Sequence, residues 1–310
     1  MEIDIVYLWV DGNEPSWLAR KNAFLGIEYT EDDINCKGRF VNNDELKYSL
    51  RSAEKFAPWI RKIFIVTDRQ IPAWLDLTHP KIQIIDHTEI LPPEALPCYN
   101  SSVIEYFLYR IPTLSEHFLY ANDDMLFNAD VSPGFFFEKD GYPIVRLQRK
   151  PFAKWSYRIE KRMKGKLSTY KQQLENAITL IDSQFHQYYP GIPHHNMDAY
   201  RKSDCRAVTE QIFSEEITAC IPHHLRSSQD IQRVIFLYYA LAIGHGHLKF
   251  VNKTESCVVR LQRKNYKRYL DTYHPKLMCV NDSQRVSDED RKRMKLFLEQ
   301  LFPQKSSFET

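Results

Sequence analysis

Glycine is scarce in this sequence, with nine glycines in 310 residues. They form neither the Gly-x-Gly-x-x-Gly turn of dinucleotide-binding proteins nor the Gly-x-x-x-x-Gly-Lys-Ser/Thr phosphate loop. Both common glycine-rich phosphate-binding loops are therefore excluded. Any phosphate bound by the chain must be held by a metal ion, by arginine side chains or by helix N-termini.

Paired cysteines and long apolar runs are also missing. The six cysteines show no Cys-x-x-Cys motif or other paired spacing, which together with the lack of an export signal predicts reduced thiols and a cytoplasmic protein. The chain starts Met1-Glu2 with no basic region, and its apolar run 234–243 is shorter than the roughly 20 residues of a spanning helix. We therefore expect neither a signal peptide nor a transmembrane helix.

Charge is nearly balanced overall but uneven along the chain. The net charge is +2, with 43% hydrophobic and 26% charged residues, which is enough apolar material for a buried core. The stretch between residues 146 and 171 contains many basic residues but only one acidic residue, Glu160. A second basic run lies between 260 and 268. The first stretch is a solvated helical face or a surface for an anionic polymer or acidic membrane. No nucleic-acid-binding motif is present, so nucleic acid is not an expected partner.

Hydrophobic patterning in the first 124 residues alternates between strand and helix character. Short β-branched runs predict strands at 3–10, 62–68, 81–86 and 117–121, with helices at 43–57 and from Ser101 or Ser102 to 111. Further helices are expected at 206–213, 229–241 and 289–302. This order predicts an α/β fold with a Rossmann-like doubly wound sheet, a basic and mainly helical insertion, and C-terminal helices.

Four of the predicted strands end at or near an aspartate, namely Asp11, Asp68, Asp86 and Asp123. Asp is a common turn residue, which is one explanation. Ligands of open α/β sheets, however, bind beyond the carboxyl ends of the strands. The Asn122-Asp123-Asp124 sequence at such an end is suited to hold Mg²⁺ or Mn²⁺ against a diphosphate, since these cations prefer carboxylate oxygens.

Two histidine pairs supply candidate acid–base groups. They occur in Pro193-His194-His195 and in Pro222-His223-His224, and imidazole is suited to act as a general base toward a hydroxyl. A zinc cluster is the competing interpretation, although neither pair has the i, i+4 spacing of two ligands on one helix face. Surface or capping roles also remain open.

Four arginines lie in or beside these segments and have the planar donors that clamp phosphate: Arg51, Arg110, Arg201 and Arg226. Structural ion pairs are the alternative for each.

Several segments closely resemble the conserved regions of Stealth proteins. Residues 3–12 (IDIVYLWVDG) resemble the first region, and residues 43–52 (NDELKYSLRS) with 57–68 and 119–124 resemble the second. Residues 193–201 with 223–230 resemble the third, and 279–282 the fourth. Stealth proteins include bacterial capsule and exopolysaccharide phosphotransferases and the animal enzyme that adds N-acetylglucosamine-1-phosphate to lysosomal glycoproteins. The resemblance implies a Rossmann-like core, a UDP-sugar donor and a requirement for Mg²⁺, with Mn²⁺ as the alternative.

The resemblance also assigns roles to individual residues. Asp123 and Asp124 correspond to the metal and diphosphate site, and His194 to the catalytic histidine, preferred over His195 because it precedes Arg201 by seven residues. Catalytic roles are thus expected for His194, Asp124 and Arg226, metal binding for Asp123 and Asp124, and substrate binding for Asp11, Arg51, Arg110, Asn122, Arg201, Asn281 and Asp282. The expected parts are a nucleotide-sugar and metal-binding half at 1–138, an insertion or lid at 139–190, and a second catalytic half at 191–310.

The implied reaction transfers a hexose-1-phosphate, from UDP-N-acetylglucosamine or a related donor, to a glycan hydroxyl and releases UMP. An ordinary metal-dependent glycosyltransferase would use the same carboxylates and release UDP. A zinc phosphohydrolase built on the histidine pairs and a non-catalytic module that binds anionic glycan through 146–171 are further alternatives. The expected partners are a UDP-sugar, a polysaccharide or oligosaccharide acceptor and, through 146–171, the inner face of a membrane.

Overall fold

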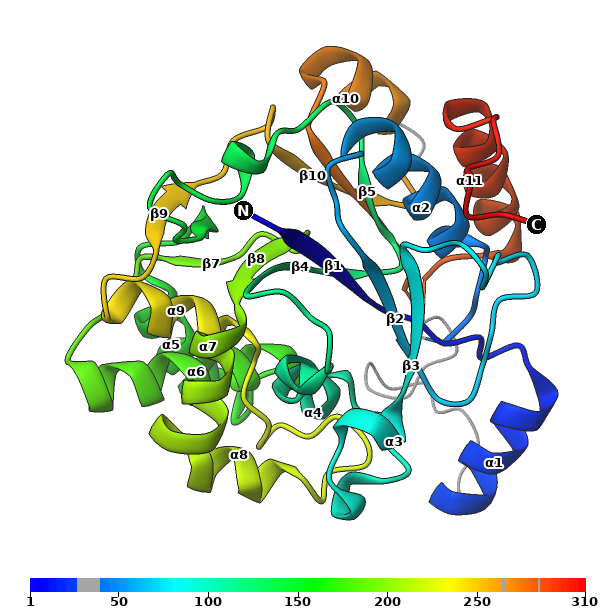
Figure 1. Cartoon of the computed structure of the whole chain (residues 1–310). Coiled ribbons are helices and arrows are strands. Elements are labelled where there is room, and N and C mark those ends of the chain that lie inside the picture. Colours follow the sequence, from blue (N-terminus) through cyan, green and yellow to red (C-terminus); the bar gives the residue numbers. More distant parts are fainter. Residues whose placement is uncertain (27–39, 264–265, 284) are drawn as a thin grey trace.

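The computed structural model describes residues 1–26, 40–263, 266–283 and 285–310 (Figure 1), so that Cys36 and Lys264 lie outside the described residues. A five-stranded sheet in the order β3-β2-β1-β4-β8 forms the centre. Strands β1 (Ile3–Leu8), β2 (Ile63–Thr67), β3 (Ile82–Asp86) and β4 (His117–Asn122) are parallel, and β8 (Asp198–Arg201) runs antiparallel to β4. All four predicted strands are confirmed.

The central sheet is covered on both faces, which explains why its strands are almost continuously apolar. Val6 and Phe64 belong to one buried cluster, whereas their strand neighbours Ile5 and Ile65 belong to another. Helix α2 (Glu45–Phe56) packs against the second cluster, while α4 (Ser101–Tyr106) and α9 (Val234–Ala242) pack against the first. The predicted doubly wound α/β fold is therefore confirmed.

The helix expected from Ser101 or Ser102 to 111 differs in detail. The cap is Asn100, whose side-chain oxygen accepts a hydrogen bond from the Ser102 backbone N at 3.0 Å. Helix α4 ends at Tyr106 and is followed by a separate 3₁₀ turn, η3 (Leu108–Arg110). Other helical elements are α1 (Pro15–Leu25), α3 (His87–Ile90), η2 (Pro93–Ala95), η4 (Pro133–Phe135), α7 (Lys202–Ala207), the π-helical η5 (Val208–Ile212) and α8 (Ser214–Cys220).

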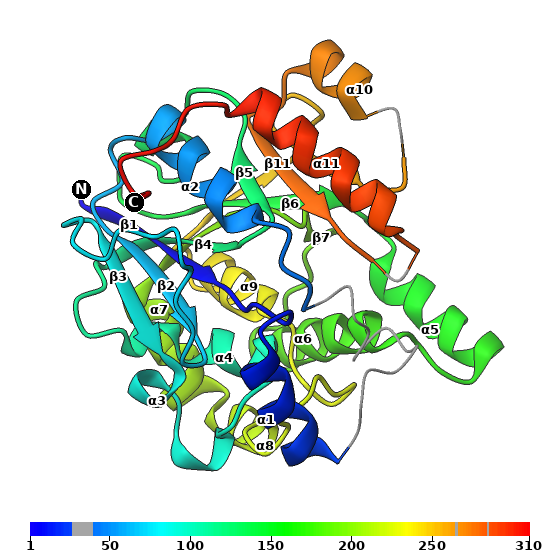
Figure 2. The same ribbon diagram turned by 90° about the vertical axis from the view of Figure 1, so that its right-hand side faces the viewer.

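Two three-stranded sheets flank the central one. The first has the order β10 (Ser256–Arg260), β11 (Leu277–Asn281), β5 (Met125–Phe127), and α10 (Tyr266–Tyr273) and α11 (Asp288–Leu301) pack with it. The second has the order β7 (Gly191–Pro193), β6 (Ile144–Arg149), β9 (His247–Phe250). Helices α5 (Ala153–Lys164) and α6 (Thr169–Phe185) follow β6, and Figure 2 shows α5 extending away from the body of the molecule.

Strand pairing brings three distant segments to the carboxyl end of β4. Residues 193–197 precede β8, and because β8 runs opposite to β4 they lie where β4 ends. Strand β11 pairs antiparallel with β5, which places Cys279 opposite Met125, one residue after Asp124. The second, third and fourth Stealth-like segments therefore meet at one edge of the sheet.

The sequence predicts reduced thiols and no transmembrane helix. The five cysteines in the described part of the chain are free and buried. No helix in the described part of the chain combines the length and apolar character needed to cross a bilayer.

Candidate active site

The meeting point of these segments is built around Asp124, His195 and Cys279, whose potential ligand atoms lie within 4.8 Å of one another. The Cys279 thiol donates to Asp124 Oδ2 at 3.4 Å, and the Val280 backbone N donates to the Asp124 carbonyl at 2.8 Å. Asn281 Nδ2 donates to His195 Nε2 at 3.1 Å. The predicted residues Asp124 and Asn281 are therefore neighbours in space.

Three carboxyl groups, those of Glu45, Asp123 and Asp124, lie close together at this edge. Burial, the charge of Glu45 and the charge of Asp124 raise the pKa of Asp123 well above its usual range. Burial raises the pKa of Asp124 to about 6 and that of Glu45 to about 7. Glu45, the first residue of α2, was not among the predicted site residues, because its position there is equally typical of a helix N-terminus.

A divalent cation fits this cluster. Asp124 Oδ1 is buried and has no hydrogen-bond partner among the described residues, so it offers a free carboxylate oxygen. Burial and the nearby Asp124 charge raise the pKa of Cys279 well above its usual range, which keeps it a thiol. An oxygen-rich site with a protonated thiol is better suited to Mg²⁺ or Mn²⁺ than to zinc.

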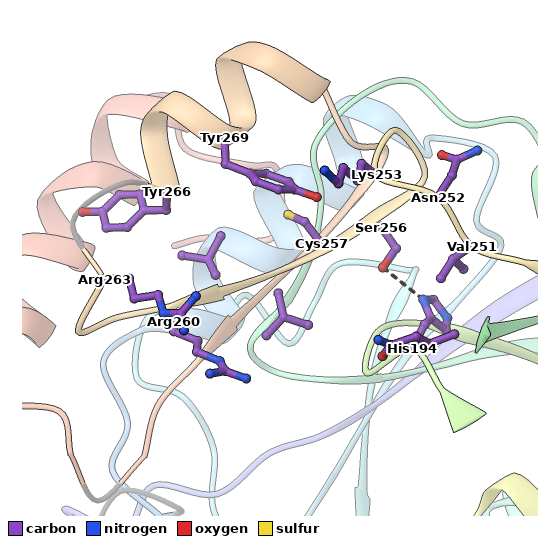
Figure 3. A pocket seen from close by; sticks show the side chains of 13 residues that line it. His194, Val251, Asn252, Lys253, Ser256, Cys257, Arg260, Arg263, Tyr266 and Tyr269 are labelled. Carbon is purple, nitrogen blue, oxygen red and sulfur yellow. Dashed lines mark hydrogen bonds between the residues drawn. The ribbon is translucent and has the colours of Figure 1, made fainter. Parts of the chain in front are cut away.

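The adjacent side chains of His194 and His195 contact different residues. His195 has a left-handed backbone (φ 56°) and faces Asn281. His194 is buried, with Nδ1 3.0 Å from Ser256 Oγ and Nε2 3.3 Å from Asp198 Oδ1. Figure 3 shows His194 and Ser256 together at the side of a cavity.

A buried polar network connects His194 to the end of β4. Arg233 Nη2 donates to Asp198 Oδ2 at 3.2 Å, and its Nη1 lies 3.8 Å from Glu105 Oε1. The Tyr120 hydroxyl lies 2.7 Å from both Glu105 Oε1 and Asn122 Oδ1. Asn122 thus joins the site through this network. Asp198, Arg233 and Glu105 were missed because they occur in segments whose patterning is that of ordinary core elements.

The local electrostatics keep His195 neutral. Burial is the main reason that its pKa falls to about 4, and the charges of Arg233 and Arg226 lower it further. A neutral imidazole has one nitrogen lone pair, and that of His195 accepts the hydrogen bond from Asn281, so a metal ion at this nitrogen would replace that bond. On these terms His195 is a candidate metal ligand beside Asp124.

Three other predicted residues lie around this centre with partners of their own. Arg226 donates from Nε and Nη2 to Ser101 Oγ, at 3.1 Å from Nε. Asp282 accepts from Arg291 at 2.8 and 3.2 Å. In the loop after β1, Asp11 Oδ1 accepts from the backbone N of Asn13 at 2.9 Å, which leaves its carboxylate at the same carboxyl end of the sheet.

Arg51, Arg110 and Arg201 are not brought to this centre. Arg51 makes two 2.7 Å hydrogen bonds to Glu309 and one to the Phe302 carbonyl. Arg201 pairs in register with His117, at the amino end of β4, and exposed Arg110 lies in the turn before that strand. Their roles in substrate binding stay predictions.

The second histidine pair lies in a separate cluster with Cys220 and Asp230. Buried Asp230 accepts from the Ser227 backbone N at 2.7 Å and from Asn100 Nδ2 at 2.9 Å, and it lies 2.6 Å from His223 Nδ1. Because these bonds already satisfy both carboxylate oxygens, they account for the cluster as a loop anchor without a metal.

Comparisons with known proteins agree with this geometry. Residues 1–29 match Stealth protein conserved region 1, and residues 39–145 match conserved region 2. The chain is 30% identical to the receptor polysaccharide phosphotransferase WefC of Streptococcus oralis over 99% of both proteins. It is 33% identical to the capsular polysaccharide phosphotransferase SacB of Neisseria meningitidis serogroup A over 99% of this chain, which spans 57% of that protein's length.

A solved structure shares the fold. The galactosyltransferase LgtC, in complex with donor and acceptor sugar analogs, covers 98% of this chain with a TM-score of 0.50 and 12% identity. This likeness concerns the fold alone. The sequence matches carry the assignment, because the WefC relative aligns from end to end and the conserved regions include the strand-end residues of the site. The chain belongs to the Stealth family.

Proposed function

We propose that this protein transfers a hexose-1-phosphate from a UDP-sugar to a hydroxyl of a glycan acceptor in capsule or exopolysaccharide synthesis. The product is a phosphodiester and the leaving group is UMP. The observation that carries the proposal is the buried group of acids at the strand ends: Asp124 lies with His195 and Cys279 within 4.8 Å, its Oδ1 has no hydrogen-bond partner among the described residues, and Glu45 and Asp123 interact with it. The phosphotransferase names of the relatives support the reaction class.

The cation proposed for this site is Mg²⁺ or Mn²⁺, held by Asp123 and Asp124 with His195 close by. When bound, it would neutralise charge on the donor diphosphate. The chain's own residues perform the remaining steps. Arg226 contributes positive charge near the diphosphate, and Asn122 and Asn281 orient groups around it.

His194 is the proposed general base. Its ring is held between Ser256 and Asp198, and an imidazole oriented by a third group is typical of activated nucleophile systems. The acceptor hydroxyl gives its proton to His194, and its oxygen attacks the phosphorus attached to the sugar. The bond from that phosphorus to the oxygen of the UMP phosphate breaks, so UMP leaves with the electron pair while the sugar C1 to oxygen bond stays intact.

We also propose that the protein works on the inner, cytoplasmic face of a membrane, attached through α5. Four large apolar side chains at helical spacing are exposed there: Phe152 (71%), Trp155 (66%), Ile159 (37%) and Met163 (81%). Basic residues surround them, including Arg158, Arg162 and Lys164. Apolar and aromatic residues on one side of a basic helix are typical of interfacial helices. Anionic lipid headgroups supply the complementary charge.

The fold shared with LgtC supports a second candidate, a metal-dependent glycosyltransferase that uses the same donor and releases UDP. Phosphorus NMR distinguishes the two. Purified protein with Mg²⁺, a panel of UDP-hexoses and an oligosaccharide pool should give UMP and a new phosphodiester resonance. UDP without a phosphodiester would replace the proposal with the glycosyltransferase, and Asp124→Asn protein serves as the blank.

A further inference from the structure

A cavity of about 520 Å³ begins at His194 and follows the edge strand β10 (Figure 3). His194 and Ser256 lie at one end of this strand, and Arg260 and Arg263 line the other end. Lys253 and Tyr269 contribute to the wall. His194 therefore borders this space, which none of Glu45, Asp123 and Asp124 lines.

The cavity runs along the edge of the small sheet, and strand register shows that one of its two sides lies on the same face as the metal-binding cluster. Strands β10 and β11 are parallel and pair Val258 with Cys279 and Arg260 with Asn281. Paired residues of neighbouring strands point to the same face. Cys279 and Asn281 contact Asp124 and His195 on that face, so the exposed Val258 and Arg260 continue it outward.

The two arginines at the far end of the cavity have no charge partner in the described part of the chain. Both are exposed, and within the described residues neither side chain makes an ion pair or hydrogen bond. Other arginines of the same half are neutralised, such as Arg291 by Asp282 and Arg293 by Asp290. Two unpaired guanidinium groups at one end of a cavity form a site for an anion such as phosphate or carboxylate.

We propose that this cavity is the acceptor subsite and that it selects a glycan carrying an anionic group in the unit before the reacting one. The inference rests on the proposed function. From Ser256 to Arg260 the strand advances four residues, or about 13 Å. That is longer than one sugar ring, so the anion bound by Arg260 and Arg263 belongs to the preceding unit or linkage. A phosphodiester made by the previous transfer is one source of this anion, and a uronate is the other.

Binding is tested with three disaccharides of N-acetylglucosamine: one linked by a phosphodiester, one linked by a neutral glycosidic bond, and one in which a uronate replaces the non-reacting sugar. Calorimetric titration of the full chain should show at least about fivefold tighter binding of an anionic probe than of the neutral one, with a preference that weakens with salt. The preferred anion identifies the source. The R260Q/R263Q variant should lose the preference, whereas R268Q, an exposed arginine outside the cavity, should keep it.

Turnover with the same probes separates this inference from the proposed function. Equal affinity for neutral and anionic probes, or a preference that survives in R260Q/R263Q, overturns the inference even when UMP is released. Anionic binding that depends on both arginines, without nucleotide release from any donor, refutes the proposed function and leaves an anionic-glycan site. In a protein that does turn over, the ratio of kcat/KM for anionic and neutral acceptors should fall toward one in R260Q/R263Q.

Discussion

Asn281 holds the ring of His195 by donating a hydrogen bond from Nδ2 to Nε2 at 3.1 Å. The bond keeps His195 beside Asp124, while the preceding His194 turns to Ser256 and Asp198. Two consecutive histidines therefore face different groups, because the left-handed backbone at His195 rotates its side chain away from that of its neighbour. We expect the pair to divide base and metal-binding roles.

Substitution of each histidine tests this division. His194→Gln should lower kcat by about 100-fold or more, the usual contribution of a general base, and leave Mn²⁺ affinity unchanged. His195→Gln should weaken Mn²⁺ binding by about tenfold or more. Turnover and Mn²⁺ titration by electron paramagnetic resonance measure the two effects. Near-normal turnover of His194→Gln together with an inactive His195→Gln would move the base to His195.

The acidic cluster should couple metal binding to pH. Because the pKa of Asp124 is raised to about 6 and that of Glu45 to about 7, these acids hold more protons in the folded protein than in the unfolded chain between about pH 4 and 7. His195, whose pKa falls to about 4, has the opposite effect over part of this window, but the acids with raised pKa, Asp123 among them, outnumber it. Without metal, the contribution of this cluster to stability should therefore fall as pH rises through the window. Mg²⁺ binds the deprotonated acids, so it should raise Tm more at pH 7.5 than at pH 5.

The matched variant for this experiment is Asp124→Asn. It removes one of the crowded charges, so its metal-free Tm at pH 7.5 should equal or exceed that of the wild type, and its gain with Mg²⁺ should be small. Differential scanning fluorimetry at both pH values measures these shifts. An equal Mg²⁺ gain in both proteins would show that the cation stabilises another part of the chain.

Arg51 should act mainly on stability. Its guanidinium is nearly buried and bonds to Glu309 and to the Phe302 carbonyl, which ties α2 to the C-terminal segment. Arg51→Ala removes the main charge partner of the buried Glu309 carboxylate, which keeps its bonds from Ser306 and its ion pair with Lys47 at 3.8 Å, and should lower the free energy of unfolding by about 3 kcal/mol. Urea unfolding measures the loss. A raised KM for the donor with unchanged stability would instead support the substrate-binding role predicted from the sequence.

The α5 surface predicts binding to anionic vesicles. Trp155→Ser/Met163→Ser removes two of the exposed apolar side chains and should reduce co-sedimentation with phosphatidylglycerol vesicles by about tenfold. Leu296→Ser, which changes an exposed leucine on α11, is the control. Phosphatidylcholine vesicles and high salt should weaken binding of the wild type. Equal sedimentation of all three proteins would exclude α5 as the membrane contact.

Most of the central fold follows from local patterns. Strands such as 62–68 and helices such as 43–57 were predictable because β-branched runs and helical periodicity are patterns of residues close together in the sequence. The cap was predicted at Ser101 or Ser102 and lies at Asn100, because several adjacent side chains can cap a helix. The boundaries at 138 and 190 stay a prediction.

Some residues of the candidate site could likewise be predicted from the sequence, and others could not. Asp123 and Asp124 could be found from sequence, since they follow a strand and match a conserved region. Glu45 and Ser256 could not, because nothing adjacent to them in sequence indicates that they meet Asp123 and His194. The sequence by itself determined the strands, their acidic ends and the family. Only the tertiary structure decided which histidine faces which acid and where Arg260 lies. These positions depend on the pairing and register of strands that are far apart in the sequence, and local patterns do not determine how such strands pair.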